Sequence, residues 1–225
     1  MSVDRVTGAS AETGRDQPVI AGLDALVADI EARAEAAAGA RIVVGIAGAP
    51  GSGKSTAAAA VIDRLGTEAA LVPMDGFHLA DEQLQALGRR DRKGAPDTFD
   101  AAGYVALLAR CRAAGRDVVY APRFVREIEE SYAQAIAVPP SARVVLTEGN
   151  YLLLDVEPWN ELDRVTDVRY HLDVDEDVRL ERLIARHVAF GKSPEEARAW
   201  SLGPDEANAR LIAASAHRAD ALLRL

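Results

Sequence analysis

Cysteine is almost absent from this sequence, because Cys111 is the only one among 225 residues. A lone cysteine cannot form an internal disulfide, and no Cys/His cluster surrounds it, so we expect a buried, inert thiol in preference to a nucleophile. The sequence also lacks an apolar run of about 18 residues, which a membrane-spanning helix would need, and its first residues lack the apolar segment of a signal peptide. These absences predict a cytoplasmic protein with no membrane partner.

Positive charge is scarce as well. Acidic residues outnumber basic ones by 35 to 26, which gives a net charge of −9, and lysine occurs only as Lys54, Lys93 and Lys192. Because such a surface would repel a phosphate backbone, no nucleic-acid partner is expected. Basic residues that matter for function must instead be concentrated locally.

The length and the 49% hydrophobic content suit one α/β domain. Residues 1–16 are polar and predict a flexible tail, whereas residues 17–225 are expected to form a single domain. This domain should begin with a helix that ends near Gly39, because Leu23, Leu26, Val27 and Ile30 have the spacing of one buried helical face.

Short apolar runs alternate with helical patterns along the rest of the chain. Strands are predicted at residues 42–46, 69–74, 143–146, 168–172 and 219–225, and helices at residues 56–65, 101–114 and 177–187. This alternation predicts a three-layer α/β fold with a parallel, five-stranded sheet. Residues 117–138 are less regular, and we expect a small lobe or hairpin there.

A phosphate-binding loop (P-loop) is predicted between the first of these strands and the following helix. The sequence there reads Gly48-Ala49-Pro50-Gly51-Ser52-Gly53-Lys54-Ser55, which matches the pattern G-x-x-x-x-G-K-S/T. Its glycines let consecutive amide N–H groups converge on phosphate oxygens at the helix N-terminus. Lys54 would bridge the β- and γ-phosphates, Ser55 would place its hydroxyl on Mg²⁺, and Thr56 would reach a phosphate nearer the nucleoside. The alternative is a chance Gly-rich turn, which the strand and helix on either side disfavour.

A P-loop does not distinguish a kinase from a GTPase, a motor or a transporter ATPase. No Asn precedes any of the three lysines, so the guanine-reading N-K-x-D element is absent, and so is the L-S-G-G-Q signature of transporters. The GTPase and transporter interpretations therefore lose most of their support.

Two acidic residues follow predicted strands, where open α/β sheets bind their ligands. Asp75 is the candidate catalytic base, because an acceptor hydroxyl must lose its proton as it attacks the γ-phosphoryl group. Glu148 is the candidate Mg²⁺-associated acid, directly or through water. The alternatives are an Asp that starts an ordinary turn and a surface Glu in a turn.

Five motifs occur in order from about Arg41 to the C-terminus: GAPGSGKST, MDGFHL, RKGAPDTFD, YAPRF and TEGNYLLL. Together they resemble the uridine kinase, phosphoribulokinase and bacterial pantothenate kinase family. The likeness is strongest to its nucleoside/nucleotide kinase-like branch, which includes fructose-transport-associated kinases. The resemblance implies a P-loop kinase fold in which Asp75 matches the catalytic Asp and Glu148 the Mg²⁺-associated acid.

The resemblance also implies roles for several basic residues. Arg92 and Lys93 match a segment beside the acceptor, in a basic loop that suits an anionic substrate or the phosphates. Arg182 and Arg186 match a mobile lid that brings arginines over the phosphates, and their i, i+4 spacing puts them on one helix face. Solvated charged surfaces are the alternative in both cases. His78 is equally compatible with a substrate contact and a structural role.

The sequence departs from the branch at Arg123-Phe124-Val125-Arg126, where relatives often have Phe-Asp-Arg. Val125 replaces that acid, which puts the acceptor specificity of the relatives in doubt for this chain. Arg126 and Tyr120 could still line the acceptor pocket.

The motifs together predict an ATP-dependent kinase that uses Mg²⁺ and transfers the γ-phosphoryl group to a hydroxyl of a small metabolite. A nucleoside, a pantothenate-like acid or a sugar would each qualify. The alternative is a regulatory P-loop module that binds ATP, hydrolyses it slowly and acts through a protein partner. The oligomeric state stays open, with a homodimer among the alternatives.

Overall fold

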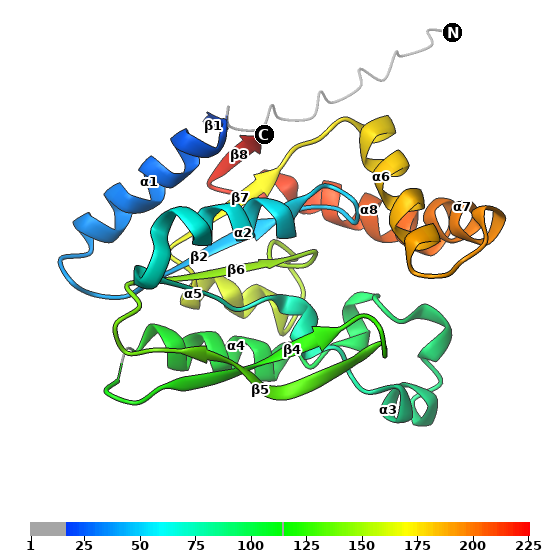
Figure 1. Ribbon diagram of the computed structural model, residues 1–225, viewed down its shortest axis with the longest axis horizontal. Coiled ribbons are helices and arrows are strands. Elements are labelled where there is room, and N and C mark those ends of the chain that lie inside the picture. Colours follow the sequence, from blue (N-terminus) through cyan, green and yellow to red (C-terminus); the bar gives the residue numbers. More distant parts are fainter. Residues whose placement is uncertain (1–16, 114) are drawn as a thin grey trace, which may run out of the picture.

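A parallel sheet of six strands forms the centre of the computed structural model, which describes residues 17–113 and 115–225 (Figure 1). The strand order is β1-β8-β7-β2-β6-β3. The bounds are β1 (Val19–Ala21), β2 (Ile42–Ala47), β3 (Ala69–Leu71), β6 (Val144–Gly149), β7 (Val168–Leu172) and β8 (Ala221–Arg224). The predicted α/β architecture and its five strands are confirmed, and β1 is a sixth strand that the sequence did not predict.

Strand β1 depends on the far end of the chain. It has three residues and pairs in parallel with β8, and backbone hydrogen bonds extend the pairing at both ends. Leu222 N–H donates to the Pro18 carbonyl at 2.9 Å, and Gly22 N–H donates to the Arg224 carbonyl at 2.8 Å. A strand this short has no pattern of its own, so its partner decides its conformation.

Helices cover both faces of the sheet, which confirms the predicted three layers (Figure 1). One face packs on α1 (Leu23–Ala36) and α2 (Lys54–Leu65), and the other on α4 (Ala101–Arg112) and α5 (Leu162–Val165). Strand β2 contributes to both cores, because Val44 and Ile46 point to the first face and Val43 and Ala47 to the second. A strand buried on both sides reads as a continuous apolar run, which is why the sequence revealed it.

Arg41 ties three segments together at the end of the sheet opposite the P-loop. Its buried guanidinium donates to the carbonyls of Ala142 at 2.7 Å, Cys111 at 2.8 Å, Pro139 at 2.8 Å and Pro140 at 3.0 Å. A buried guanidinium needs acceptors of this kind, and the four carbonyls supply them. Cys111 itself is buried, and burial raises the pKa of its thiol, in keeping with the inert cysteine that was predicted.

A two-stranded antiparallel hairpin lies beside β3, and α3 (Asp81–Ala86) contacts it, because Asp81 N–H donates to Glu130 Oε1 at 2.9 Å (Figure 1). The hairpin consists of β4 (Val119–Val125) and β5 (Glu130–Val138), which confirms the hairpin expected at residues 117–138. Its turn, residues 126–129, points toward the C-terminal helices.

Three C-terminal helices, which we call the lid, stand beside the sheet: α6 (Glu176–Ala189), α7 (Pro194–Leu202) and α8 (Pro204–Ser215) (Figure 1). Asp175 caps α6 by accepting hydrogen bonds from the N–H groups of Asp177 and Val178, and Ser193 forms a capping box with Glu196 at the start of α7. No helix in the described part of the chain is long and apolar enough to cross a membrane. The predicted tail at residues 1–16 lies outside the described residues, and one domain over residues 17–225 stays a prediction.

Candidate active site

The P-loop, residues 48–55, leads from β2 into α2, as predicted. Gly51 and Gly53 have φ angles of 84° and 94°, a region that side chains rarely tolerate. A Cβ atom on Gly51 would also lie 2.5 Å from the carbonyl oxygen of Arg179 in α6. The loop therefore needs glycine there both for its curvature and for the close approach of the lid.

The start of α2 suits a triphosphate. Gly53 precedes the helix with no side chain capping the first N–H groups, so these donors are available to an anion. Lys54 is buried in the first turn, and burial lowers the pKa of its ammonium group, while the negative charges of Glu148 and Asp75 oppose that shift. An anionic phosphate would remove the cost of holding this charge away from water.

Ser55 and Glu148 meet at the mouth of the P-loop. The Ser55 hydroxyl donates to Glu148 Oε1 at 3.0 Å, and burial raises the pKa of Glu148, opposed by Lys54. Two oxygen ligands at this distance suit Mg²⁺, which favours oxygen and keeps several waters. No cluster of three or more His, Cys, Asp and Glu residues that could hold a metal occurs in residues 17–113 and 115–225, so other Mg²⁺ ligands would be water and phosphate oxygens.

Asp75 lies in a 3-10 turn, Met74–Phe77, that follows β3. Strand β3 is shorter than predicted, although Val72 N–H still donates to the Leu146 carbonyl at 2.8 Å. Arg126 in the hairpin turn donates from Nη2 to Asp75 Oδ2 at 3.0 Å. The hairpin thus brings a guanidinium to the candidate base, a contact between residues 51 positions apart.

The charge on Asp75 is set by its surroundings. Burial favours the neutral acid, but the positive charges of His78, Arg126 and Lys54 outweigh it and lower the pKa of Asp75. Burial also lowers the pKa of His78. At neutral pH His78 is therefore uncharged, and the positive charge in contact with Asp75 is the Arg126 guanidinium. The Asp75 carboxylate is ionised.

Gly76 explains why the MDGFHL motif has glycine after the aspartate. A Cβ atom there would lie 2.5 Å from the carbonyl oxygen of Pro122 in β4. The hairpin can approach the Asp75 turn this closely only because residue 76 has no side chain, and Arg126 reaches Asp75 as a result.

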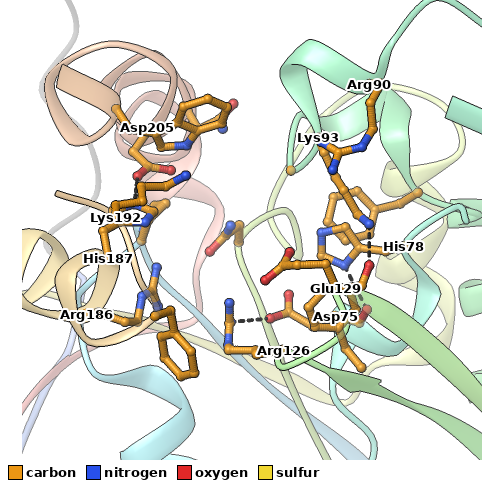
Figure 2. A pocket seen from close by; sticks show the side chains of 18 residues that line it. Asp75, His78, Arg90, Lys93, Arg126, Glu129, Arg186, His187, Lys192 and Asp205 are labelled. Carbon is orange, nitrogen blue, oxygen red and sulfur yellow. Dashed lines mark hydrogen bonds and ion pairs between the residues drawn. The ribbon is translucent and has the colours of Figure 1, made fainter. Parts of the chain in front are cut away.

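A cavity of about 310 Å³ opens between the Asp75 side and the lid (Figure 2). The P-loop and neighbouring strand ends contribute Pro50, Asp75, His78, Phe99 and Asn150 to its lining. The loop after α3 and the hairpin contribute Arg90, Lys93, Gly94, Phe124, Arg126 and Glu129. The lid contributes Arg186, His187, Phe190, Lys192, Trp200, Asp205 and Asn208.

Several predicted site residues meet in this cavity: Asp75, His78, Lys93, Arg126 and Arg186. Burial, with repulsion from Arg126, lowers the pKa of Arg186, but a guanidinium stays charged at neutral pH. Arg182 lies at the P-loop instead, where its Nη1 is 3.6 Å from the point that a Cβ atom on Gly53 would occupy. Of the two predicted lid arginines, Arg182 therefore lies at the P-loop and Arg186 lines the cavity.

Two residues that were predicted to bind the acceptor lie outside the cavity lining. Arg92 pairs with Asp97 through both Nη atoms on the surface, and the Tyr120 side chain is 52% exposed on β4. The basic residues after α3 therefore have different roles. Arg90 and Lys93 line the cavity, whereas Arg92 pairs with Asp97 within the same loop.

Sequence reasoning did not foresee the aromatic part of the lining. The His78 ring packs between Phe99, with centroids 4.0 Å apart, and Phe124, with centroids 4.7 Å apart, and the ring planes are tilted by 42° and 37°. His78 Nδ1 lies 2.8 Å from its other contact, the Asp75 carbonyl oxygen. Phe99 and Phe124 belong to the motifs PDTFD and YAPRF, but nothing in the sequence alone puts them on either side of His78.

The lid contributes two further contacts that the sequence did not specify. His187 Nε2 lies 2.7 Å from Asp205 Oδ2, and Lys192 Nζ lies 4.6 Å from the centroid of the Trp200 ring. At the base of the lid, Arg179 pairs with Glu206 at 2.6 Å and donates to the Pro50 carbonyl at 3.4 Å. Arg179 is thereby a structural link between the lid and the P-loop.

These features together are those of a P-loop kinase: the P-loop joins a buried strand to a helix, acidic residues follow the neighbouring strands, and the lid carries arginines. The chain belongs to the Phosphoribulokinase / Uridine kinase family, whose model matches residues 43–222. This finding confirms the family resemblance, and none of the comparisons supports a regulatory module.

Relatives and solved structures agree with this assignment. The chain is 35% identical over 160 residues to a provisionally named uridine kinase of Schizosaccharomyces pombe, which covers 67% of this chain and 68% of that protein. It is 32% identical over 194 residues to the uncharacterized protein YggC of Escherichia coli, which covers 82% and 78%. A Silicibacter crystal structure, provisionally named a fructose transport system kinase, superposes with a TM-score of 0.80 at 38% identity, covering 91% of this chain and 98% of that one.

Proposed function

We propose that this kinase transfers the γ-phosphoryl group of ATP to a hydroxyl group of a small metabolite. The observation that carries the proposal is the position of Asp75, an ionised carboxylate that lines a cavity which also touches Pro50 of the P-loop. Phosphoryl transfer needs an acceptor oxygen in line with the γ-phosphorus and a group that takes the acceptor proton. The cavity offers room for the acceptor, and Asp75 offers the base.

Each part of the site has a role in this proposal. The P-loop amides, Lys54 and Thr56 hold the phosphates, and Ser55 and Glu148 hold Mg²⁺, which supplies charge neutralisation when bound. The acceptor oxygen forms a bond to the γ-phosphorus while the bond from that phosphorus to the bridging oxygen of ADP breaks, and the acceptor proton passes to Asp75. Arg182 and Arg186 stabilise the negative charge on the transferring group.

The acceptor-side residues orient the substrate in this proposal. Arg126 helps to lower the pKa of Asp75, and the packing of His78 against Phe99 and Phe124 gives the cavity an aromatic wall. Lys93 holds the loop after α3 against the hairpin, because its ammonium donates to Asp81 Oδ1 at 2.6 Å and to the Glu129 carbonyl at 2.5 Å. These contacts favour a preformed acceptor pocket.

The acceptor class can be narrowed by direct assay. Nucleosides and sugars are suggested by the provisional names of two relatives, which mention uridine and fructose transport, and a pantothenate-like acid also fits the family. The test is ADP release with ATP and Mg²⁺ over a panel of nucleosides, sugars, pantothenate and glycerate, with Asp75→Asn as the blank. One acceptor should raise ADP release well above the blank, whereas equal release with and without every acceptor would count against a kinase of small metabolites.

A further inference from the structure

The cavity carries more positive charge than the protein as a whole. Its lining has five cationic and three acidic side chains, whereas the whole chain has a net charge of −9. The cations are Arg90, Lys93, Arg126, Arg186 and Lys192, and the acids are Asp75, Glu129 and Asp205. A local excess of positive charge of this kind attracts anions.

Three of the five cations already have a partner or a role. They belong to the proposed phosphoryl-transfer site or hold the loop after α3 in place. Arg126 pairs with Asp75 at 3.0 Å, and Arg186 stands on the lid wall beside the reacting end of the cavity (Figure 2). Lys93 donates to Asp81 and the Glu129 carbonyl, and only 8% of its side chain is exposed. Under the proposed function, Asp75, the transferring phosphoryl group and the loop after α3 account for these three charges.

The other two cations, Arg90 and Lys192, have unused binding capacity. Arg90 donates to Asp81 only through Nε, at 2.6 Å, and its side chain is 47% exposed. Asp81 serves Lys93 as well, so one carboxylate faces two positive charges. Lys192 lies over the Trp200 ring and has no ion pair within the described residues. The charge of Lys192 helps to lower the pKa of Glu196, but that carboxylate is held by Ser193 in the α7 capping box, and Asp205 in the same lining pairs with His187.

Arg90 and Lys192 lie on opposite walls of the cavity, both away from Asp75 (Figure 2). Arg90 belongs to the loop after α3, and Lys192 follows α6 at the tip of the lid. A guanidinium can grip a carboxylate or phosphate with two parallel hydrogen bonds, and an ammonium adds a mobile point charge. A ligand that touches both would join the acceptor loop to the lid.

We infer that the acceptor is an anionic hydroxy compound whose carboxylate or phosphate binds between Arg90 and Lys192 while its hydroxyl lies at Asp75. This inference rests on the proposed function. The negative group would contribute binding energy far from the reacting atoms and would draw the lid toward the core. A neutral acceptor of the same shape would leave Lys192 without an ion pair and the Nη donors of Arg90 without an anionic partner in the closed cleft.

Matched pairs of acceptors test the charge directly. Glycerate and glyceramide, pantothenate and pantothenol, fructose 6-phosphate and fructose, and uridine monophosphate and uridine differ mainly in the anionic group. Binding of each is measured by calorimetry with the P-loop occupied by Mg²⁺ and a non-hydrolysable ATP analogue, and turnover is measured with ATP. The charged member of at least one pair should bind about tenfold or more tightly than its neutral partner, and the pair that responds distinguishes a carboxylate from a phosphate.

Variants assign that preference to residues. Arg90→Ala and Lys192→Ala should each weaken binding of the charged probe about tenfold with little effect on its neutral partner, and Lys192→Arg should restore most of it. The matched control is Arg89→Ala, since Arg89 pairs with Asp97 outside the cavity and its removal should change nothing. Equal affinities within every pair, absence of binding by every charged probe, or charged-probe binding that survives both alanine variants would overturn the inference. Charged-probe binding without phosphoryl transfer would instead count against the kinase proposal and leave the anion site standing.

Discussion

The two walls of the cleft differ in how the chain builds them. The proposed phosphate wall is one continuous segment, residues 48–55, which offers mainly backbone N–H groups and one lysine. The acceptor wall is assembled from side chains of four segments, residues 75–78, 90–99, 124–129 and 186–208. In the proposed function, local backbone geometry binds the triphosphate, which the family shares, whereas the acceptor binds to side chains that only the tertiary fold brings together.

Asp75→Asn should give the largest difference between the two walls, because it should affect turnover but not ATP binding. This change removes the base but keeps the shape, so turnover should fall by roughly 10² to 10⁴ while ATP affinity changes little. Steady-state rates and ATP titration measure the two effects. Unchanged phosphoryl transfer would remove Asp75 from the mechanism.

Lys54→Ala should affect the phosphate wall instead. Loss of the buried ammonium should weaken ATP binding and lower turnover together, each by about 10². Calorimetric titration of ATP and the same rate assay would measure this. A variant that binds ATP as tightly as the wild type would contradict the phosphate cradle assigned to the P-loop.

Arg126→Ala tests how the hairpin tunes the base, and it should lower kcat/KM by about tenfold at acid pH. Arg126 helps to lower the pKa of Asp75, so its removal raises that pKa and the carboxylate becomes protonated at higher pH. Activity that needs the ionised form should therefore begin to fall at a higher pH in the variant than in the wild type. The pH profile of kcat/KM measures this, and Arg123→Ala, an exposed arginine on β4, is the control. An acid limb at the wild-type position would show that the ion pair does not influence the base.

Arg92→Ala should have the smallest effect. Arg92 and Asp97 form an exposed ion pair, so thermal stability should hardly change and acceptor KM should change by less than about twofold. Thermal unfolding and acceptor kinetics are the measurements. A large rise in KM would restore the acceptor-side role that the family resemblance implies for Arg92.

The same contrast between the walls explains what the sequence could predict. Buried strands and the P-loop have local signatures, namely apolar runs and glycine spacing, and these located β2, β6, β7 and the phosphate site. Strand β1 was missed because its three residues need β8 from the opposite end of the chain. The pairing of Arg126 with Asp75 and the stacking of His78 on Phe99 and Phe124 were missed because neither follows from sequence spacing.

The most direct test of the kinase proposal follows the phosphorus atom itself. Phosphorus-31 NMR of the protein with ATP, Mg²⁺ and each charged and neutral acceptor should show, for one acceptor, a new phosphate monoester that grows as fast as ADP and is absent with Asp75→Asn. ADP that accumulates only with inorganic phosphate, whatever acceptor is present, would mean that water receives the γ-phosphoryl group and would contradict the account.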